Sequence, residues 1–335
     1  MSARPAPLGI SRRLPGLAGS PGYGTDQDQR DIPIPTTNVT IPISPLQQRH
    51  RGRCPLHPLI IGLHGGGYDH QYFNATPTYS ASRLSTALQV PFISIDRSSY
   101  GKTNSTPPIP ETSDFSQETG HWLHKYILPK LWSEIGLPNQ CTCIVLCHSF
   151  GVMGGIVAAA LHAEEKTPLY ALGGLIASGM WNTQAPSAME RSTLSYVPID
   201  ADHVMFGVDT KDTVMFKPGT AAPEILDQCE QLNAACPVAE LRGFAETCLP
   251  SWKEKWAARV TVPVLFALVE DDPFFVATEE ELGICVKAFR NSKRVDGSLV
   301  RGAPHCLELS LCLRGWYARC FGFALECAAG FEGSK

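Results

Sequence analysis

No segment of this 335-residue chain stays apolar for the roughly 18 to 20 residues that a membrane-spanning helix needs. An excess of one charge is also lacking, since the formal net charge is −4 and the isoelectric point is about 6.2. Such a chain has no strong positive field to attract a nucleic acid or an anionic membrane. We therefore expect no nucleic-acid partner and no membrane span.

A secretory signal is missing too, because the N-terminal residues contain no continuous apolar core. Residues 1–24 are rich in proline, glycine and serine and carry arginines but no acidic residue. Mitochondrial presequences share this composition, but the prolines oppose the amphipathic helix that a presequence forms, so a disordered tail fits better. We predict such a tail over residues 1–30 and a cytoplasmic protein.

The chain has twelve cysteines but lacks the paired Cys-x-x-Cys spacing of zinc knuckles. In a cytoplasmic protein thiols stay reduced, so disulfide bonds are not expected. Cys141, Cys143 and Cys147 lie close together, but the apolar run between the last two is typical of a buried strand. The cysteine spacing therefore predicts no metal site, and the mechanism that the motifs below imply requires no metal or organic cofactor.

Short apolar runs alternate with helical patterns along most of the chain. Such runs are typical of the central strands of a parallel sheet, since both faces of these strands are buried. Five runs cover residues 59–63, 90–95, 142–147, 175–178 and 262–269. Helical spacing separates them, most clearly over 150–165, and a last strand is expected near 298–300. This order predicts an α/β fold with a doubly wound, mostly parallel sheet.

The alternation stops between residues 182 and 257. These residues are mixed in composition, contain several prolines and glycines, and show no clear strand. They are too many for a simple connection within a compact domain. We interpret residues 182–257 as a cap inserted into a core that residues 31–181 and 258–335 form.

Residues 147–151 (CHSFG) lie between an expected buried strand and an expected helix. They resemble the G-x-S-x-G nucleophile elbow of the α/β-hydrolase family, which places a serine on a tight, strained turn. The residues two positions before and after the serine must be small. Gly151 meets this demand, and Cys147 stands where the family has its first glycine. A serine that caps a helix is the alternative. The strand before it and the helix after it favour Ser149 as the nucleophile.

A second segment, residues 64–68 (HGGGY), follows the first expected central strand. It resembles the HGGG loop with which lipases and esterases of this family donate backbone N–H groups to the oxyanion hole. The resemblance implies donors at Gly66 and Gly67, and a further donor at Phe150, where the next helix begins. An ordinary glycine-rich turn after a strand is the alternative.

Residues 96–101 (DRSSYG) follow the next expected strand and resemble an Asp-Arg-x-x-x-Gly segment found in many members of the family. We interpret Asp96 as an acid that braces a loop, not as a catalytic group.

Two later segments complete the resemblance. Residues 270–273 (EDDP) end an expected strand, and the family often has its catalytic acid directly before a proline, which favours Asp272 over the two acidic residues before it. Residues 302–305 (GAPH) resemble the G-x-x-H loop of the family, which implies His305 as the base. The order serine, aspartate, histidine is that of this family and differs from the orders in chymotrypsin and subtilisin.

The resemblance implies acyl transfer to water, in which Ser149 attacks a carbonyl carbon, His305 takes its proton and Asp272 orients His305. The expected small-molecule substrate is a carboxylic ester, a thioester or a lactone. Apolar cap residues such as Phe206 and Phe216 are compatible with an apolar or polyketide-like secondary metabolite, although packing of the cap explains them more simply. A lyase or cyclase of the same fold, and a member that binds a small molecule without turnover, remain alternatives.

Overall fold

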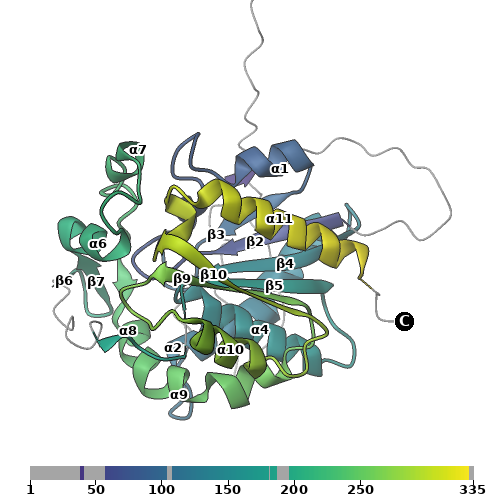
Figure 1. The fold of residues 1–335 in the computed structure, drawn as a ribbon. Coiled ribbons are helices and arrows are strands. Elements are labelled where there is room, and N and C mark those ends of the chain that lie inside the picture. Colours follow the sequence, from purple (N-terminus) through teal and green to yellow (C-terminus); the bar gives the residue numbers. More distant parts are fainter. Residues whose placement is uncertain (1–37, 41–56, 104–107, 181, 187–195, 332–335) are drawn as a thin grey trace, which may run out of the picture.

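The computed structural model describes residues 38–40, 57–103, 108–180, 182–186 and 196–331 (Figure 1). The tail predicted over residues 1–30 lies outside these ranges.

A seven-stranded sheet forms the centre of the molecule. Its strands lie in the order β1 (Asn38–Thr40), β3 (Phe92–Ile95), β2 (His57–Leu63), β4 (Cys141–His148), β5 (Leu172–Ser178), β9 (Val264–Asp271) and β10 (Val295–Pro304). The short edge strand β1 is antiparallel to β3, and the other neighbours are parallel. All five apolar runs fall on strands of this sheet, which confirms the predicted mostly parallel α/β fold.

Helices cover both faces of the sheet, as a doubly wound fold requires (Figure 1). On one face, α1 (Ser82–Leu88) lies beside α11 (Leu313–Ala329), and α11 packs on β2, β4 and β5. The other face holds α2 (Phe115–Trp122), α4 (Gly151–Glu164) and α10 (Glu279–Ala288). Because both faces are covered, every residue of β4 is buried.

The helical segment over residues 115–136 is continuous but contains two wide turns. After α2 come a π-helical turn, Leu123–Ile127, the short α3, Leu128–Leu131, and a second π-helical turn, Trp132–Gly136. Pro129 lies between the two turns and has no N–H to donate to the preceding turn. Wide turns are a known way for a helix to absorb such a break without ending.

The inserted residues contain strands that the sequence pattern did not reveal. A second, three-stranded antiparallel sheet consists of β6 (Tyr196–Pro198), β7 (His203–Phe206) and β8 (Cys236–Pro237). The expectation of no strand was therefore wrong here. These strands have two to four residues, which is too short for an alternating pattern to stand out. Two helices, α6 (Val208–Met215) and α7 (Pro223–Leu226), lie between β7 and β8.

The last part of the insertion packs on the core. It consists of α8 (Val238–Gly243), η4 (Phe244–Cys248), α9 (Leu249–Ser251), η5 (Trp252–Trp256) and η6 (Ala257–Arg259). Trp252 is fully buried, and its ring stacks on Phe266 of β9 at 6.4 Å between centroids. The insertion thus has one part near the carboxyl end of the sheet and one part beside α4. That residues 182–257 form a separate cap stays a prediction.

Candidate active site

Three of the side chains singled out in the sequence meet at the carboxyl edge of the sheet. Ser149 directly follows β4, Asp272 follows β9 and His305 follows β10. His305 Nε2 lies 3.1 Å from Ser149 Oγ, and His305 Nδ1 lies 2.9 Å from Asp272 Oδ2. A carboxylate at Nδ1 keeps the proton on that nitrogen, so Nε2 is left to accept the proton of the serine hydroxyl.

The backbone at Ser149 has the strained geometry of a nucleophile elbow. Its φ angle is +51°, in the left-handed region that a serine rarely adopts. The serine N–H donates to the carbonyl of Ser178 at 2.8 Å, which ties the turn to β5. A side chain at Gly151 would lie 2.7 Å from the carbonyl oxygens of Leu63 and His64, so this position must be glycine.

Cys147, which replaces the first glycine of the motif, fits because of a second glycine. A methyl group on Gly155 would overlap Cys147 Sγ. The helix α4 therefore provides the space that the sulfur fills. Both residues are fully buried, and burial raises the pKa of the Cys147 thiol above its usual range.

The glycine loop after β2 runs against the elbow. A side chain on Gly65 would lie 2.8 Å from Ser149 Cβ, and one on Gly66 would lie 2.6 Å from the ring of Phe150. Only a bare backbone can approach the serine this closely.

His64 fixes the peptide between Gly65 and Gly66. Its Nε2 accepts from the N–H of Arg97 at 3.1 Å, so its Nδ1 carries the proton and donates to the Gly65 carbonyl at 2.8 Å. Burial and the neighbouring Arg97 lower the pKa of His64 to about 3, so the ring keeps this neutral form. Because N–H and C=O point in opposite directions across a trans peptide, the Gly66 N–H faces away from His64.

The three predicted oxyanion donors differ in their surroundings. The Gly67 N–H is directed at the thiol of Cys236, whose pKa burial raises to about 12 despite this contact. Within the described ranges, the N–H groups of Gly66 and Phe150 have no protein acceptor. Phe150 also precedes the first residue of the 14-residue helix α4, where the helix dipole favours negative charge. Gly66 and Phe150 are thus the two donors free for a substrate oxygen.

The two acidic residues next to Asp272 are engaged elsewhere. Glu270 binds the N–H of Gly302 and pairs with Arg301, while Asp271 pairs with Lys217 at 2.7 Å. Asp272 has a fully buried side chain, and its second oxygen accepts from the N–H of Phe274 at 2.9 Å. Of the three acids, Asp272 is the one in contact with His305.

Sequence reasoning missed a buried carboxyl group beneath these residues. Glu308 is fully buried and accepts hydrogen bonds from Tyr72 Oη at 2.8 Å, Trp316 Nε1 at 2.8 Å and Ser178 Oγ at 3.0 Å. Burial raises its pKa. A single acid inside the apolar run 306–309 (CLEL) was the signal that could have drawn attention to it.

His148 joins this carboxyl group to the candidate triad. Its Nδ1 lies 3.3 Å from Glu308, its ring stacks on Tyr72, and its centroid is 5.0 Å from that of His305. Burial and the neighbouring His305 lower the pKa of His148 well below its usual value. The ring is therefore neutral, with Nε2 buried and without a partner in the described part of the chain.

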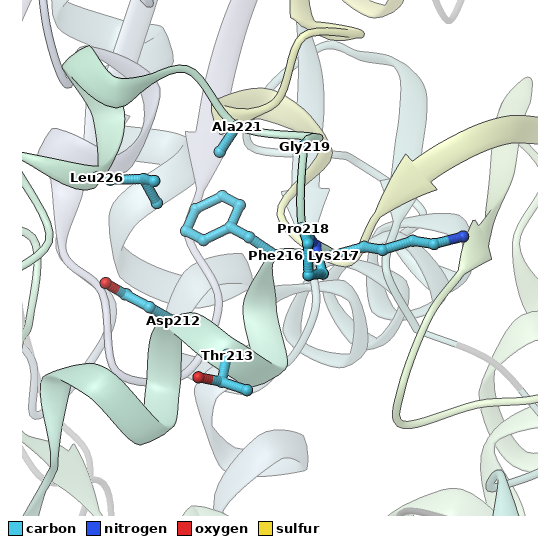
Figure 2. A pocket seen from close by; sticks show the side chains of 8 residues that line it. All are labelled: Asp212, Thr213, Phe216, Lys217, Pro218, Gly219, Ala221 and Leu226. Atoms are coloured by element: carbon cyan, nitrogen blue, oxygen red, sulfur yellow. The ribbon is translucent and has the colours of Figure 1, made fainter.

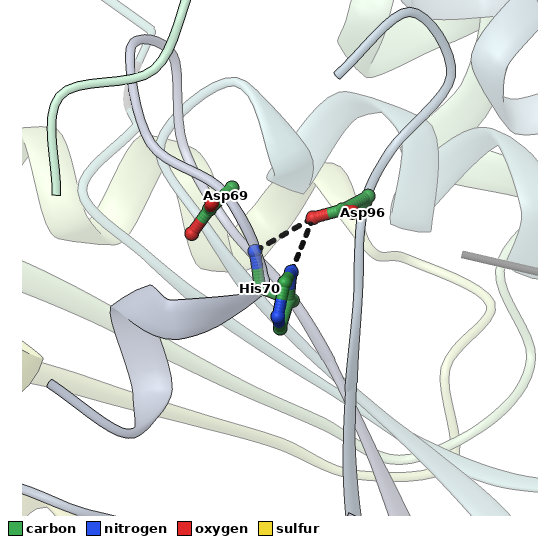
Figure 3. Close-up of side chains that lie close together, drawn as sticks. All are labelled: Asp69, His70 and Asp96. Atoms are coloured by element: carbon green, nitrogen blue, oxygen red, sulfur yellow. Dashed lines mark hydrogen bonds and ion pairs between the residues drawn. The ribbon is translucent and has the colours of Figure 1, made fainter. Parts of the chain in front are cut away.

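Asp69, His70 and Asp96 form a cluster whose ligand atoms lie within 4.8 Å of one another (Figure 3). One oxygen of Asp96 accepts from the His70 backbone N–H at 2.9 Å and contacts His70 Nδ1 at 2.7 Å, and its other oxygen accepts from the Lys102 N–H at 3.3 Å. Asp69 accepts from the N–H of Gln71 and so begins a short helix. Hydrogen bonds thus occupy these carboxylates, which confirms the interpretation of Asp96 as a loop brace.

A cavity of about 230 Å³ lies in the insertion (Figure 2). Phe216, Ala221 and Leu226 give it apolar walls, and Asp212 and Thr213 line another side (Figure 2). None of the predicted catalytic or oxyanion residues lines it. Phe206 and Phe216 are 8% and 6% exposed, so their rings pack mainly in the interior, in agreement with the simpler explanation that they pack the cap.

No protein-family model matches this chain, and a comparison with curated proteins finds no match either. Solved structures do match. A lipase-esterase related protein from Clostridium acetobutylicum is 13% identical, with a TM-score of 0.55 over 79% of this chain and 94% of that one. A monoacylglycerol lipase from Paleococcus ferrophilus is 12% identical, with a TM-score of 0.53 over 81% and 96%.

A thermophilic esterase from Thermogutta terrifontis is 17% identical, with a TM-score of 0.51 over 81% of this chain and 90% of that one. Identities this low show a shared fold and nothing finer. Together with the strand order, they show that the chain has the α/β-hydrolase fold that the sequence motifs predicted. Among the described helices, none has the length and apolar character needed to cross a membrane.

Proposed function

We propose that this protein of α/β-hydrolase fold is a serine hydrolase that cleaves a carboxylic ester, a thioester or a lactone through an acyl-enzyme on Ser149. The observation that carries the proposal is the hydrogen-bonded chain from Asp272 through His305 to Ser149 Oγ, at 2.9 and 3.1 Å. Near this chain of hydrogen bonds are the backbone N–H groups of Gly66 and Phe150, which have no protein acceptor in the described ranges.

In the first half of the reaction, Ser149 Oγ bonds to the substrate carbonyl carbon while His305 Nε2 takes the hydroxyl proton. Asp272 stabilises the imidazolium that forms. Gly66 and Phe150 donate to the oxyanion, which stabilises the transition state by roughly 3 to 4 kcal/mol per donor. The bond to the leaving group then breaks, and that group takes the proton from His305.

The second half repeats these steps with water as the nucleophile. His305 removes a proton from the water, whose oxygen attacks the acyl carbon, and the oxyanion is held by the same two donors. The bond between the acyl carbon and Ser149 Oγ breaks, and the proton returns from His305 to the serine. A free acid is released and the site is restored.

An apolar substrate is favoured by the aromatic residues beside the serine. Phe150 directly follows Ser149 and is partly exposed, its ring lies 5.0 Å from that of Phe244, and Phe275 lies 6.1 Å from Phe244. Aromatic rings of this kind bury acyl chains or alcohol groups well. A secondary metabolite as the natural substrate and a cytoplasmic location belong to the same proposal.

The test is covalent labelling with a fluorophosphonate, followed by intact mass. The wild type should gain one adduct, while Ser149→Ala should gain none and Ser149 in His305→Ala should react far more slowly. A well-folded wild type that gains no adduct contradicts the acyl-enzyme mechanism. That result would favour a lyase or cyclase that uses the same pocket, or a member that binds without turnover.

A further inference from the structure

Lys211 is a buried lysine without an acidic partner. It lies on α6 of the insertion and is 1% exposed. Its Nζ donates to the carbonyl oxygens of Gly67 at 2.9 Å and Leu232 at 3.4 Å, and it lies 4.0 Å from the centre of the Tyr68 ring. No carboxylate of the described residues is within ion-pair distance of this ammonium group.

The partners of Lys211 place it at the end of the glycine loop, residues 64–68, which is called the oxyanion loop below. Gly67, at φ +69°, has its carbonyl bound both by Lys211 and by the N–H of Ala234 at 3.0 Å. Its own N–H faces Cys236. Both backbone polar groups of Gly67 are thus bound by residues of the insertion. The residue before it in the chain is Gly66, one of the predicted oxyanion donors.

Packing alone does not explain a lysine at this position. Burying an ammonium group costs free energy, and methionine would fill the same space without that cost. The cost is visible in the pKa of Lys211, which burial lowers from 10.5 to about 8. A buried charge that is kept in this way next to a candidate catalytic loop points to a role in that loop.

We propose that Lys211 is a positioning residue through which the insertion fixes the oxyanion loop, and that its positive charge adds to the stabilisation of the oxyanion. This inference rests on the proposed function. The ammonium holds the Gly67 carbonyl, which keeps the neighbouring Gly66 in place against the ring of Phe150. Its charge acts across the buried loop, where little water screens it.

Because Lys211 supplies positive charge to the oxyanion, the rate at which Ser149 reacts with a fluorophosphonate should fall at alkaline pH. The ionisable groups that face Nζ are Asp69, Asp212, Cys229, Cys306 and Tyr68. Burial raises the pKa of each of the two thiols to about 12 and raises that of Tyr68 well above its ordinary value, so these groups stay neutral near pH 8. Compared with the two thiols and Tyr68, Lys211 is the group whose pKa lies near 8. Above that pH the neutral amine no longer supplies the charge, and the reaction slows.

The experiment measures the second-order rate constant of Ser149 labelling by a fluorophosphonate between pH 6.5 and 9.5, by intact mass. Wild type is compared with Lys211→Met, which keeps the volume, and with Lys293→Met, an exposed control away from the site. At pH 7 we expect Lys211→Met to react about tenfold more slowly, less than the loss caused by removing a direct oxyanion donor. Its rate should not fall above pH 8, whereas the rates of wild type and Lys293→Met should.

The thermal midpoint separates this role from a fold defect. Lys211→Met removes a buried charge but also the hydrogen bonds to the carbonyls of Gly67 and Leu232, and these two effects oppose each other, so its midpoint should stay close to that of the wild type. Equal rates and pH profiles in wild type and Lys211→Met overturn the inference while leaving the proposed function intact. A wild type that is never labelled overturns the proposed function itself. If Lys211→Met does not fold, the wild-type profile decides: a fall above pH 8 supports the inference, and a flat profile between pH 7 and 9 overturns it.

Discussion

At position 147 a sulfur atom occupies the space that the first glycine of a nucleophile elbow usually leaves empty. Gly155, about one turn into α4, supplies that space. The strain of the elbow is concentrated at Ser149, whose φ of +51° is held by the hydrogen bond from its N–H to β5. A nucleophile elbow needs small residues around its serine. Here Cys147 meets this need only together with Gly155, which lies outside the motif.

This pairing predicts the outcome of a double mutant cycle. Gly155→Ala alone should lower the free energy of unfolding by about 1 to 3 kcal/mol, because the new methyl overlaps Cys147 Sγ. Adding Cys147→Gly should recover part of that loss, since the overlap disappears. Urea unfolding measures both. Gly322→Ala on α11 is the matched control, since nothing lies within 4 Å of its added methyl. Additive effects of Cys147→Gly and Gly155→Ala would contradict the pairing.

Between elements, the buried carboxyl of Glu308 holds several chain segments together. It follows β10 by a few residues and receives hydrogen bonds from β5, α11 and the short helix η1 (His70–Phe73), with His148 of β4 close by. Both Ser178 and His148 also flank the elbow. Glu308 thus joins the loop that carries His305 to the strands that carry Ser149.

The raised pKa of Glu308 predicts a pH dependence of stability. The folded protein retains a proton that the unfolded chain loses above its ordinary pKa of 4.5. The unfolding free energy should therefore fall as pH rises from 4.5 toward the folded-state pKa. Glu308→Gln removes this contribution, so its stability should fall less over the same interval. Urea unfolding at several pH values measures the difference between the two proteins, and parallel curves would show that Glu308 does not titrate there.

For the whole molecule, the insertion is fastened to the core at the carboxyl edge of the sheet. Arg97, which follows β3, pairs with Glu240 of α8, and the Arg97 Nε donates to the His64 carbonyl at 2.7 Å. Lys211 and Ala234 bind Gly67 from the same side. The insertion therefore contacts the glycine loop after β2 directly, and its attachment there depends on buried polar contacts.

Breaking the buried pair should destabilise the protein strongly. Glu240→Gln leaves the buried Arg97 without its countercharge, and the loss of one partner of such a pair typically costs about 3 to 5 kcal/mol. Asp296→Asn, which breaks the exposed pair with Arg294, should cost about 1 kcal/mol or less. Chemical denaturation of both variants measures the contrast. Equal, small effects would mean that Arg97 finds another partner.

Much of this arrangement was predictable because it depends on local pattern. The apolar runs predicted the central strands, since a strand buried on both faces needs consecutive apolar residues. Ser149, Asp272 and His305 could be chosen because the residues around each resemble a family motif, in the family's order. The structure brings them together because the parallel strands that precede them end at one edge of the sheet.

The tertiary structure decided what depends on contacts between distant segments. Strands of two to four residues in the insertion leave no periodic signal, and they form because neighbouring segments pair with them. Lys211 looks like an ordinary surface residue in the sequence, and only packing buries it. Glu308 stands alone in an apolar run, but only the structure shows which side chains donate to its carboxyl group. The Gly67 N–H, predicted as an oxyanion donor, faces Cys236, a residue 169 positions later. Local sequence thus determined the elements and their order, while long-range packing determined which polar groups near Ser149 are free to bind a substrate.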